Sequence, residues 1–554
     1  MTTYNKVSLL EMRKYFSLLL VTALTISSSL GCSSNVTNDT ENEISNPQET
    51  ETIKVFYNDP YQFTSPPDTC ESPICLSLLE LIDNSESSID FAVYGMRNQT
   101  DILESLIKAK ERGVSVRGII DRDSENINYY SSTESWVSLL GNIKDDFLSE
   151  EEASFKQYED KCPRPEGFKG PLQCLAYDLG DSWIIAEHVS VENFADPTVN
   201  SASNKIMHNK FFIIDSRKVW TGSTNISDTG TGGYNANVAA VIDSREVAIT
   251  YRHEFEQMLN GSYHQTKISN GIERVDLGNA KLSIWFSPQD NAMEDGVIPV
   301  LAEAKSHIDV SIFYLTHKDV AAELISAHKR GVLVRVIVDA TSATNGYTKH
   351  ELIRLAGIPV KVENWGGKMH MKSASIDDEY LILGSMNWTG AGADKNDENT
   401  IIIKSSKLAA EHSENFEQLW NGIPEKWEQP GQRPSPESVD SGSACFDGVD
   451  NDFDGKSDED DPGCSSGEQL PLLPPNRILQ KTNSPSIPQG YKLYPSLGSN
   501  GDCNPNYKGV CLPNSNFDIL NCTQIATKDF LVTREDTFKL DGNNDGEACE
   551  TWSP

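Results

Sequence analysis

The sequence lacks three features that often decide the class of a protein. Its N-terminal apolar run, residues 15–26, is shorter than the roughly 20 residues that a membrane-spanning helix needs. No two cysteines have the C-x-x-C spacing of a zinc site. Basic residues are also scarce, since 47 Lys and Arg stand against 82 Asp and Glu and give a formal net charge of −35. A chain this acidic has no general attraction for a polyanion, so contact with nucleic acid or anionic lipid needs a local basic patch or a bridging cation.

The residues that are present suffice for a folded protein. Hydrophobic residues make up 38% and aromatic residues 8% of the 554 residues, which excludes disorder of the whole chain. At roughly 150 residues per domain, the length predicts three or four domains, or one large unit with attachments.

Residues 1–32 have the features of an export signal. Arg13 and Lys14 precede the apolar run, and small residues follow it up to Gly31 and Cys32. This ending resembles a lipoprotein cleavage site, in which Cys32 is acylated; a cleaved signal peptide with an incidental cysteine is the alternative. We therefore predict an exported protein, either a lipoprotein anchored at a membrane or cell surface or a secreted protein. Residues 33–50 are expected to be a polar tether.

The other ten cysteines lie in pairs that are close in the sequence. In an exported chain such pairs predict disulfide bonds, although the sequence does not fix their connectivity. We expect local pairing: Cys70 with Cys75, Cys162 with Cys174, Cys445 with Cys464, Cys503 with Cys511, and Cys522 with Cys549.

The body of the chain contains an internal repeat of strand, helix and strand. The strands of the first copy lie at 89–94 and 114–121, and those of the second at 308–314 and 332–339. A duplicated α/β half explains this order. We therefore predict an α/β fold of two pseudo-symmetric halves, residues 51–270 and 271–425, each a central β-sheet flanked by helices. An extra stretch in the first copy, at about 125–200, is expected to form a lid or wall.

Each half ends in the same polar pattern. In both copies a Lys follows the His by two residues, an Asp by seven and a Ser by fifteen, and an Asn comes two residues after the Ser. Two copies at equal offsets are far more specific than one such triplet. The two sets are His208, Lys210, Asp215, Ser223 and Asn225, and His370, Lys372, Asp377, Ser385 and Asn387.

The spacing of this pattern suits a phosphate site. Residues two apart lie on one face of a strand, and buried polar groups need partners, which the facing copy can supply. Two His, two Lys and two Asn around one small space form a receptor for a tetrahedral phosphate. One His can then attack phosphorus while the other protonates the leaving oxygen.

These motifs resemble the phospholipase D superfamily, in the form with two HKD motifs in one chain. The resemblance implies that the halves pack as an internal pseudo-dimer in a monomer. It also implies cleavage of a phosphodiester through a phosphohistidine intermediate, with no cofactor for catalysis. By the family pattern His208 is the nucleophile and His370 the general acid. The two Lys and two Asn hold the phosphate with the Ser residues in support, and Asp215 and Asp377 orient the motifs.

The two halves differ at one family position. The second half has the acidic residue Glu398 in the sequence Asn-Asp-Glu-Asn, whereas the first half has Asn235-Ala236-Asn237 and lacks the glutamate. In the family this glutamate helps to orient a motif histidine. Its absence leaves open which histidine is the nucleophile.

The C-terminal region carries two candidate calcium motifs. One lies between Pro- and Ser-rich linkers at 426–444 and 465–490, and the other follows the second linker. The segment 445–464 has the EF-hand ligand spacing. The tail, 491–554, resembles an Excalibur-type calcium-binding domain. The alternative for each is a solvated run of charges. The expected ligands of a structural Ca²⁺ are Asp450, Asp452, Asp454, Asp458 and Asp461 in the first motif, and Asp541, Asn543, Asp545 and Glu550 in the second.

Three functions remain open at this stage. We predict a phospholipase D-type phosphodiesterase that hydrolyses phospholipid head groups at a membrane surface. A secreted or surface-anchored nuclease that uses the same paired site is the alternative, and the net charge weighs against it unless a basic groove lies over the site. A calcium-dependent adhesion protein with a vestigial catalytic body is the third, and the intact motifs disfavour it.

Overall fold

The computed structural model describes residues 52–121 and 205–466, with short pieces elsewhere. Those pieces are residues 130, 132–133, 136, 139–140, 174–178, 183–187, 506–508, 512, 530–532, 540 and 547–548. The export signal with Cys32, the tether, most of the 125–200 stretch, the 465–490 linker and most of the tail lie outside the described residues. So do Cys162, the side chain of Cys174, Cys503, Cys511, Cys522 and Cys549, and the expected ligands Asp541, Asn543, Asp545 and Glu550.

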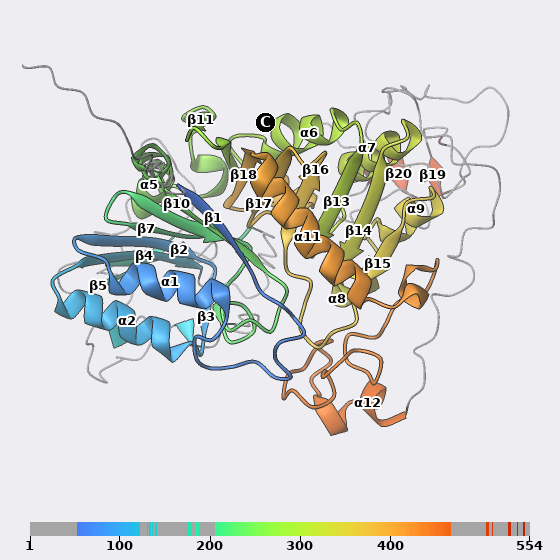
Figure 1. Cartoon of the computed structure of the whole chain (residues 1–554), viewed down its shortest axis with the longest axis horizontal. Helices are drawn as coiled ribbons and strands as arrows, with labels where there is room; N and C mark the ends of the chain where they lie inside the picture. Colours follow the sequence, from blue (N-terminus) through green and yellow to red (C-terminus); the bar gives the residue numbers. More distant parts are fainter. Residues whose placement is uncertain are drawn as a thin grey trace, which may run out of the picture. The chain divides into compact units, whose positions relative to one another are not determined.

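The first half is built on an eight-stranded mixed sheet (Figure 1). Its order is β1-β10-β8-β7-β2-β4-β6-β5, with β2, β4 and β6 parallel to one another and the remaining pairs antiparallel. The strands are β1 (Ile53–Tyr57), β2 (Ser88–Val93), β4 (Ser115–Asp121), β5 (Cys174–Asp178), β6 (Trp183–Glu187), β7 (Lys210–Ile214), β8 (Lys218–Gly222) and β10 (Val238–Asp243).

Helices cover both faces of this sheet. Side chains alternate across a strand, so β7 sends Phe212 and Ile214 into the core with α1 (Pro73–Asp83) and α2 (Thr100–Glu111). The same strand sends Phe211 and Ile213 to the opposite face, where they pack with α5 (Arg245–Leu259).

The second half repeats this plan. Its sheet has the order β11-β12-β18-β17-β16-β13-β14-β15, and the central β16-β13-β14 corresponds to β7-β2-β4. Helices α6 (Ile298–Ala302) and α7 (Lys318–Lys329) cover one face and α11 (Ser406–Gly422) the other. The strands are β11 (Glu273–Asp276), β12 (Lys281–Ser287), β13 (His307–Ile312), β14 (Leu333–Val338), β15 (Val360–Val362), β16 (Lys372–Ile376), β17 (Tyr380–Gly384) and β18 (Glu398–Lys404).

The two halves share one central core. Buried side chains of α5, such as Tyr251 and Phe255, and of α11, such as Phe416 and Trp420, belong to a single hydrophobic cluster. The predicted α/β class with two helix-flanked sheets is therefore confirmed. Of the described helices, none combines the length and apolarity required to cross a membrane.

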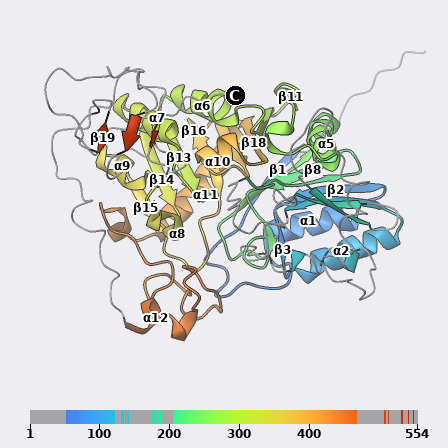
Figure 2. The ribbon, with the colours of Figure 1, turned by 180° about the vertical axis from the view of Figure 1, so that it is seen from behind.

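Smaller elements connect and follow the sheets. In both ribbon views the segment that ends in α12 lies next to α8 (Figures 1 and 2). These elements are β3 (Met96–Arg97), β9 (Ile226–Ser227), α8 (Ala340–Thr344), α9 (His350–Leu355), α10 (Gly390–Asp394), α12 (Pro462–Ser466), and the short strands β19 (Tyr507–Lys508), β20 (Phe530–Val532) and β21 (Glu547–Ala548).

Residues 426–444, expected to be a linker, pack on the second half instead. Trp427 and Ala444 are buried, and Arg354 donates to the carbonyls of Trp427 and Gln432. These anchoring residues explain why the Pro- and Ser-rich composition does not give a free linker here. Two of the expected disulfides, Cys70–Cys75 and Cys445–Cys464, are formed.

Candidate active site

Each His–Lys pair lies where a central strand begins. β7 starts at Lys210 and β16 at Lys372, and the histidines come two residues earlier. The backbone N–H of His208 donates to the carbonyl of Asp397 over 2.9 Å, and that of His370 donates to the carbonyl of Ala236 over 2.9 Å. A loop of the opposite half therefore fixes each motif.

The lysines are fully enclosed. Lys210 is 0% and Lys372 1% exposed, while His208 and His370 keep 6% and 8% of their surface. Each ammonium donates to the carbonyl of its own motif histidine, over 2.6 Å in the first copy and 2.7 Å in the second. Lys210 also lies over the ring of Tyr94, and Lys372 over the ring of Phe313, the next residues after β2 and β13. The two rings also contact the histidines.

The Nδ1 atoms of the two histidines have different partners. His208 Nδ1 lies 2.8 Å from Glu398 Oε2, whereas His370 Nδ1 lies 3.2 Å from Asn237 Oδ1. Asn237 thus takes in the first half the place that Glu398 has in the second. Sequence reasoning noted the missing glutamate but did not identify Asn237 as its substitute.

The motif serines stand behind these partners. Ser385 donates to Glu398 over 2.7 Å, and Ser223 donates to Asn237 over 2.8 Å. Because these hydroxyl protons are engaged within the protein, Ser223 and Ser385 support the site through these partners rather than as phosphate donors. Ser385 orients Glu398, the partner of His208, and Ser223 orients Asn237, the partner of His370.

Burial and mutual repulsion set the charges of the site. Burial, with the nearby Lys210 and Lys372, lowers the pKa of His208 well below its usual value, and the same causes lower the pKa of His370. Burial also lowers the pKa of Lys210 to about 7 and that of Lys372 well below its usual value. Burial raises the pKa of Glu398 to about 8. Burial and the two lysines therefore favour the neutral imidazoles, and a bound phosphate anion would offset the crowding of positive charge and favour protonation of the histidine that acts as general acid.

Asp215 and Asp377 lie away from the chemistry. Each follows the end of its strand, about 16 Å along the chain from the motif lysine at roughly 3.3 Å per residue. Both have a positive φ, 52° and 56°. Asp215 accepts the backbone N–H groups of residues 86–88, and Asp377 those of residues 305–307. These backbone bonds outweigh the opposing effect of partial burial and lower the pKa of both carboxyl groups. The two carboxylates therefore fasten turns and take no direct part in the chemistry.

The motif asparagines differ in accessibility. Asn225 is 4% exposed and its Nδ2 donates to the hydroxyl of Tyr130 over 2.5 Å, whereas Asn387 is partly exposed. Within the described residues, the Oδ1 atoms of both have no hydrogen-bond partner. Sequence reasoning missed Tyr130, because it lies in the long insertion outside either motif.

A buried ionic network anchors Asp397, the residue before Glu398 and β18. Lys267 Nζ contacts Glu254 and lies 2.7 Å from Asp397 Oδ1, and all three side chains are almost fully enclosed. Burial opposes the charge of Lys267, but Asp397 and Glu254 outweigh it and raise its pKa. The backbone carbonyl of Asp397 accepts the N–H of His208, so this network also holds the backbone of the first motif in place.

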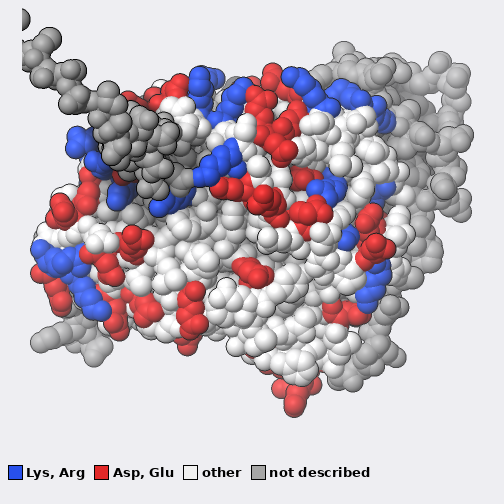
Figure 3. All heavy atoms as spheres, in the orientation of Figure 1, with Lys and Arg blue, Asp and Glu red and all other residues white. Residues whose placement is uncertain are grey.

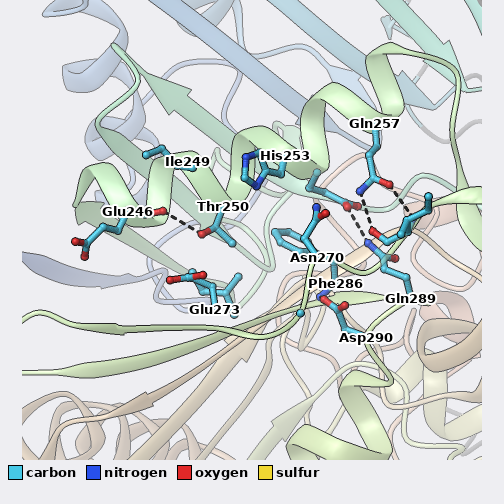
Figure 4. Close-up of a pocket in the computed structure, with 14 residues that line it drawn as sticks. Glu246, Ile249, Thr250, His253, Gln257, Asn270, Glu273, Phe286, Gln289 and Asp290 are labelled. Atoms are coloured by element: carbon cyan, nitrogen blue, oxygen red, sulfur yellow. Dashed lines mark hydrogen bonds between the residues drawn. The ribbon is translucent and has the colours of Figure 1, made fainter.

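Glu254 also lines a separate cavity of about 430 Å³ between α5 and β12 (Figure 4). Figure 4 shows its wall of α5 side chains, including Glu246 and His253, facing Phe286 and Asp290. No motif residue lines it, so this cavity is distinct from the paired His–Lys site.

The Asp-rich segment gathers carboxylates in a changed combination. Two groups have ligand atoms within 4.8 Å of one another: Glu437, Asp450 and Asp452, and Asp452, Asp454 and Asp461. Asp458 lies in neither group, and its carboxylate accepts the N–H groups of Asp447 and Gly448. Glu437, which lies before the motif and which sequence reasoning missed, belongs to the first group. These oxygens fit a hard divalent cation.

Comparisons with known proteins point to one family. A family model described as "Cardiolipin synthase, PLD-like domain" matches residues 78–259 and 297–420, together more than half of the chain. The chain is 33% identical over 121 residues to the mitochondrial cardiolipin hydrolase of Chlamydomonas reinhardtii, covering 22% of this chain and 54% of that protein. It is 31% identical over 142 residues to the phospholipase D of Rickettsia conorii, covering 26% and 70%.

A solved structure is also similar. The phospholipase D family member Nuc from Salmonella typhimurium is 27% identical with a TM-score of 0.25, covering 26% of this chain and 97% of that one. The chain spans about half the length of the algal relative.

Proposed function

The chain belongs to the family of phospholipase D-like domains, and we propose that it is a phosphodiesterase that hydrolyses phospholipid head groups through a phosphohistidine intermediate. The observation that carries the proposal is the paired site: two histidines and two enclosed lysines lie together, and each motif is fixed by the other half.

The different Nδ1 partners assign the two roles. When Glu398 is ionised, it accepts the proton of His208 Nδ1, which leaves the electron pair of Nε2 free. Because the pKa of Glu398 is raised to about 8, this form becomes more populated as the pH rises toward 8. A carboxylate at Nδ1 also stabilises the positive charge that develops when Nε2 attacks. His370 has a neutral amide oxygen at this place, which stabilises its cation less and makes it the better proton donor. We therefore assign His208 as the nucleophile and His370 as the general acid.

The reaction takes two balanced steps. In the first, the electron pair of His208 Nε2 forms a bond to phosphorus, the bond from phosphorus to the alcohol oxygen breaks, and His370 gives its proton to that oxygen. In the second, His370 takes a proton from water, the water oxygen bonds to phosphorus, and the P–N bond breaks to restore His208. Lys210, Lys372, Asn225 and Asn387 bind the non-bridging oxygens and stabilise their charge.

Charge and relatives favour lipid over nucleic acid as substrate. On the face drawn in Figure 3, basic and acidic side chains are interspersed, and the described residues form no continuous basic track there. Such a track is what a nucleic-acid backbone requires. Two similar curated proteins are named for phospholipid hydrolysis.

The test supplies the full chain with phosphatidylcholine vesicles, cardiolipin vesicles and single-stranded DNA in parallel, with His208→Ala as control. Release of a head group that depends on His208 supports the proposal. DNA cleavage without head-group release would replace it with the nuclease alternative, and no turnover of any diester would refute the enzymatic function.

We also propose that the Asp-rich segment binds a divalent cation such as Ca²⁺ through Glu437, Asp450, Asp452, Asp454 and Asp461, as structural support. The proximity of these carboxylates supports it. Burial, together with Asp461 and Asp452, raises the pKa of Glu437 to about 7, and a bound cation would offset this repulsion. The thermal midpoint of unfolding with Ca²⁺ and with EDTA tests this proposal.

A further inference from the structure

We propose that the disulfide-closed Asp-rich segment, residues 445–464 with the preceding Ser443, positions the general acid His370 by holding two loops through Tyr234 and Lys368. This inference rests on the proposed function, because it concerns the same site. Tyr234 and Lys368 are positioning residues in this account, since neither contacts the reacting atoms.

Tyr234 fastens the loop of the first half. Its side chain is 1% exposed, and its hydroxyl donates to the carboxylate of Asp447 and lies 2.9 Å from the Ser443 hydroxyl. Asp447 itself is 7% exposed. A buried hydroxyl and carboxylate left without each other would be costly, so this contact fixes the approach of the segment.

Lys368 fastens the loop of the second half. Its ammonium donates to the carbonyl of Asn451 and, over 2.5 Å, to the hydroxyl of Thr341 in α8. It also lies 5.1 Å from the centre of the Phe453 ring. Two of these three contacts, with Asn451 and Phe453, are made to the Asp-rich segment, so the segment helps to set the place of this flexible side chain.

The two fastened loops are joined to each other and carry His370 and its partner. The backbone N–H of Lys368 donates to Asn235 Oδ1 over 2.8 Å, and that of Ala236 donates to the carbonyl of Lys368 over 2.8 Å. Two residues farther along, the N–H of His370 donates to Ala236, and His370 Nδ1 meets Asn237. A shift of either loop therefore changes the direction of the His370 ring.

Positioning of a general acid has a specific kinetic signature. Proton donation matters when the leaving group is a strongly basic alkoxide and matters little when it is a nitrophenolate, which leaves without a proton. A variant that only displaces His370 should therefore lose activity toward an alkyl diester and keep it toward a nitrophenyl diester. A general loss of folding would lower both equally.

The experiment compares Tyr234→Phe and Lys368→Met with the wild type on phosphatidylcholine and on bis(4-nitrophenyl) phosphate. Phe446→Ala is the matched control, because this side chain belongs to the same segment and is 80% exposed. We expect kcat/KM for the lipid to fall about tenfold in both variants, a part of the roughly 10²–10⁴-fold that a correctly placed general acid contributes. The nitrophenyl diester should change less than about twofold. Equal losses on both substrates, or no loss, would overturn the inference.

Hydrogen exchange at residues 366–371 and 234–237 gives a second measurement that needs no turnover. Both segments should exchange faster in Tyr234→Phe and Lys368→Met and remain unchanged in Phe446→Ala. If the wild type cleaves neither diester, the proposed function fails. Unchanged exchange in both variants would separately refute the positioning.

Discussion

At the scale of single residues, the two histidines differ in the partner of Nδ1, which is a glutamate side chain at His208 and an asparagine amide at His370. His208 has Glu398 at Nδ1 and His370 has Asn237, although their own motifs are identical in spacing. The roles therefore depend on residues outside the HKD pattern. A diester that needs no general acid should separate them.

A His370→Ala variant should release nitrophenolate from bis(4-nitrophenyl) phosphate in a burst of about one equivalent and then stall, because the attack remains but water is no longer activated. Mass spectrometry should find the added phosphoryl group on His208. His208→Ala should give no burst. A burst from His208→Ala with modification of His370 would reverse the assignment.

Lys210 is the residue at which function and stability conflict. It is 0% exposed and its pKa is lowered from 10.5 to about 7, so the folded protein is destabilised while this group is charged. Below pH 7 the lysine is charged in both the folded and the unfolded chain, and the full cost applies. Between pH 7 and 10.5 the unfolded chain binds more protons, so the stability contributed by this group rises with pH.

A Lys210→Met variant should therefore be inactive yet more stable than the wild type, by about 1–4 kcal/mol below pH 7. The gain should shrink as the pH rises from 7 toward 10.5. Urea unfolding at pH 6 and pH 9 measures it. A variant less stable than the wild type at pH 6 would contradict the account of a costly buried charge.

At the scale of elements, the site depends on how α5 and the start of β18 are joined. Lys267 bridges Glu254 of α5 and Asp397, the residue before β18, in an enclosed network. The same aspartate holds the backbone of His208. Sequence reasoning missed this bridge, since a lone Lys between two halves belongs to neither motif.

Lys267→Met should destabilise the protein by roughly 3–5 kcal/mol, because two buried carboxylates lose their counter-charge. Burial, with Asp397 as a further cause, raises the pKa of Glu254 to about 7. A Glu254→Gln change should therefore recover part of the loss when added to Lys267→Met. Urea midpoints of the single and double variants decide it, and additive losses would count against the bridge.

At the scale of the whole molecule, the Asp-rich segment is packed on the catalytic body through Tyr234, Lys368 and Thr341. Cation binding to this segment should therefore stabilise the body and not only the segment. Ca²⁺ at about a hundred times its Kd should add roughly 2.7 kcal/mol to the free energy of unfolding.

The measurement is the thermal midpoint with Ca²⁺ and with EDTA. Glu437→Gln should remove most of the difference, and Glu459→Gln, an exposed acid of the same region, should retain it. Equal midpoints in Ca²⁺ and EDTA for the wild type would mean that the segment binds no such ion.

The sequence by itself determined the features that are local. The 3.3 Å rise and alternation of a strand place a His and a Lys two residues apart on one face, so the motif spacing alone predicts both pairs. The repeat of strand, helix and strand likewise predicts two α/β halves, because each turn and apolar face is set by neighbouring residues. The short separations of Cys70 from Cys75 and of Cys445 from Cys464 favoured local pairing without fixing it, and the structure contains both bonds.

Only the tertiary structure decided what lies opposite each motif. Glu398 meets His208 across 190 residues, and Asn237 meets His370 across 133. Glu437 likewise comes close to Asp450 and Asp452 only through the fold, because it lies before the motif in the sequence. Such partners depend on how the cores of two halves pack. The pattern of residues within one segment does not predict how two distant segments pack. The partners of the two histidines could therefore be identified only from the folded structure.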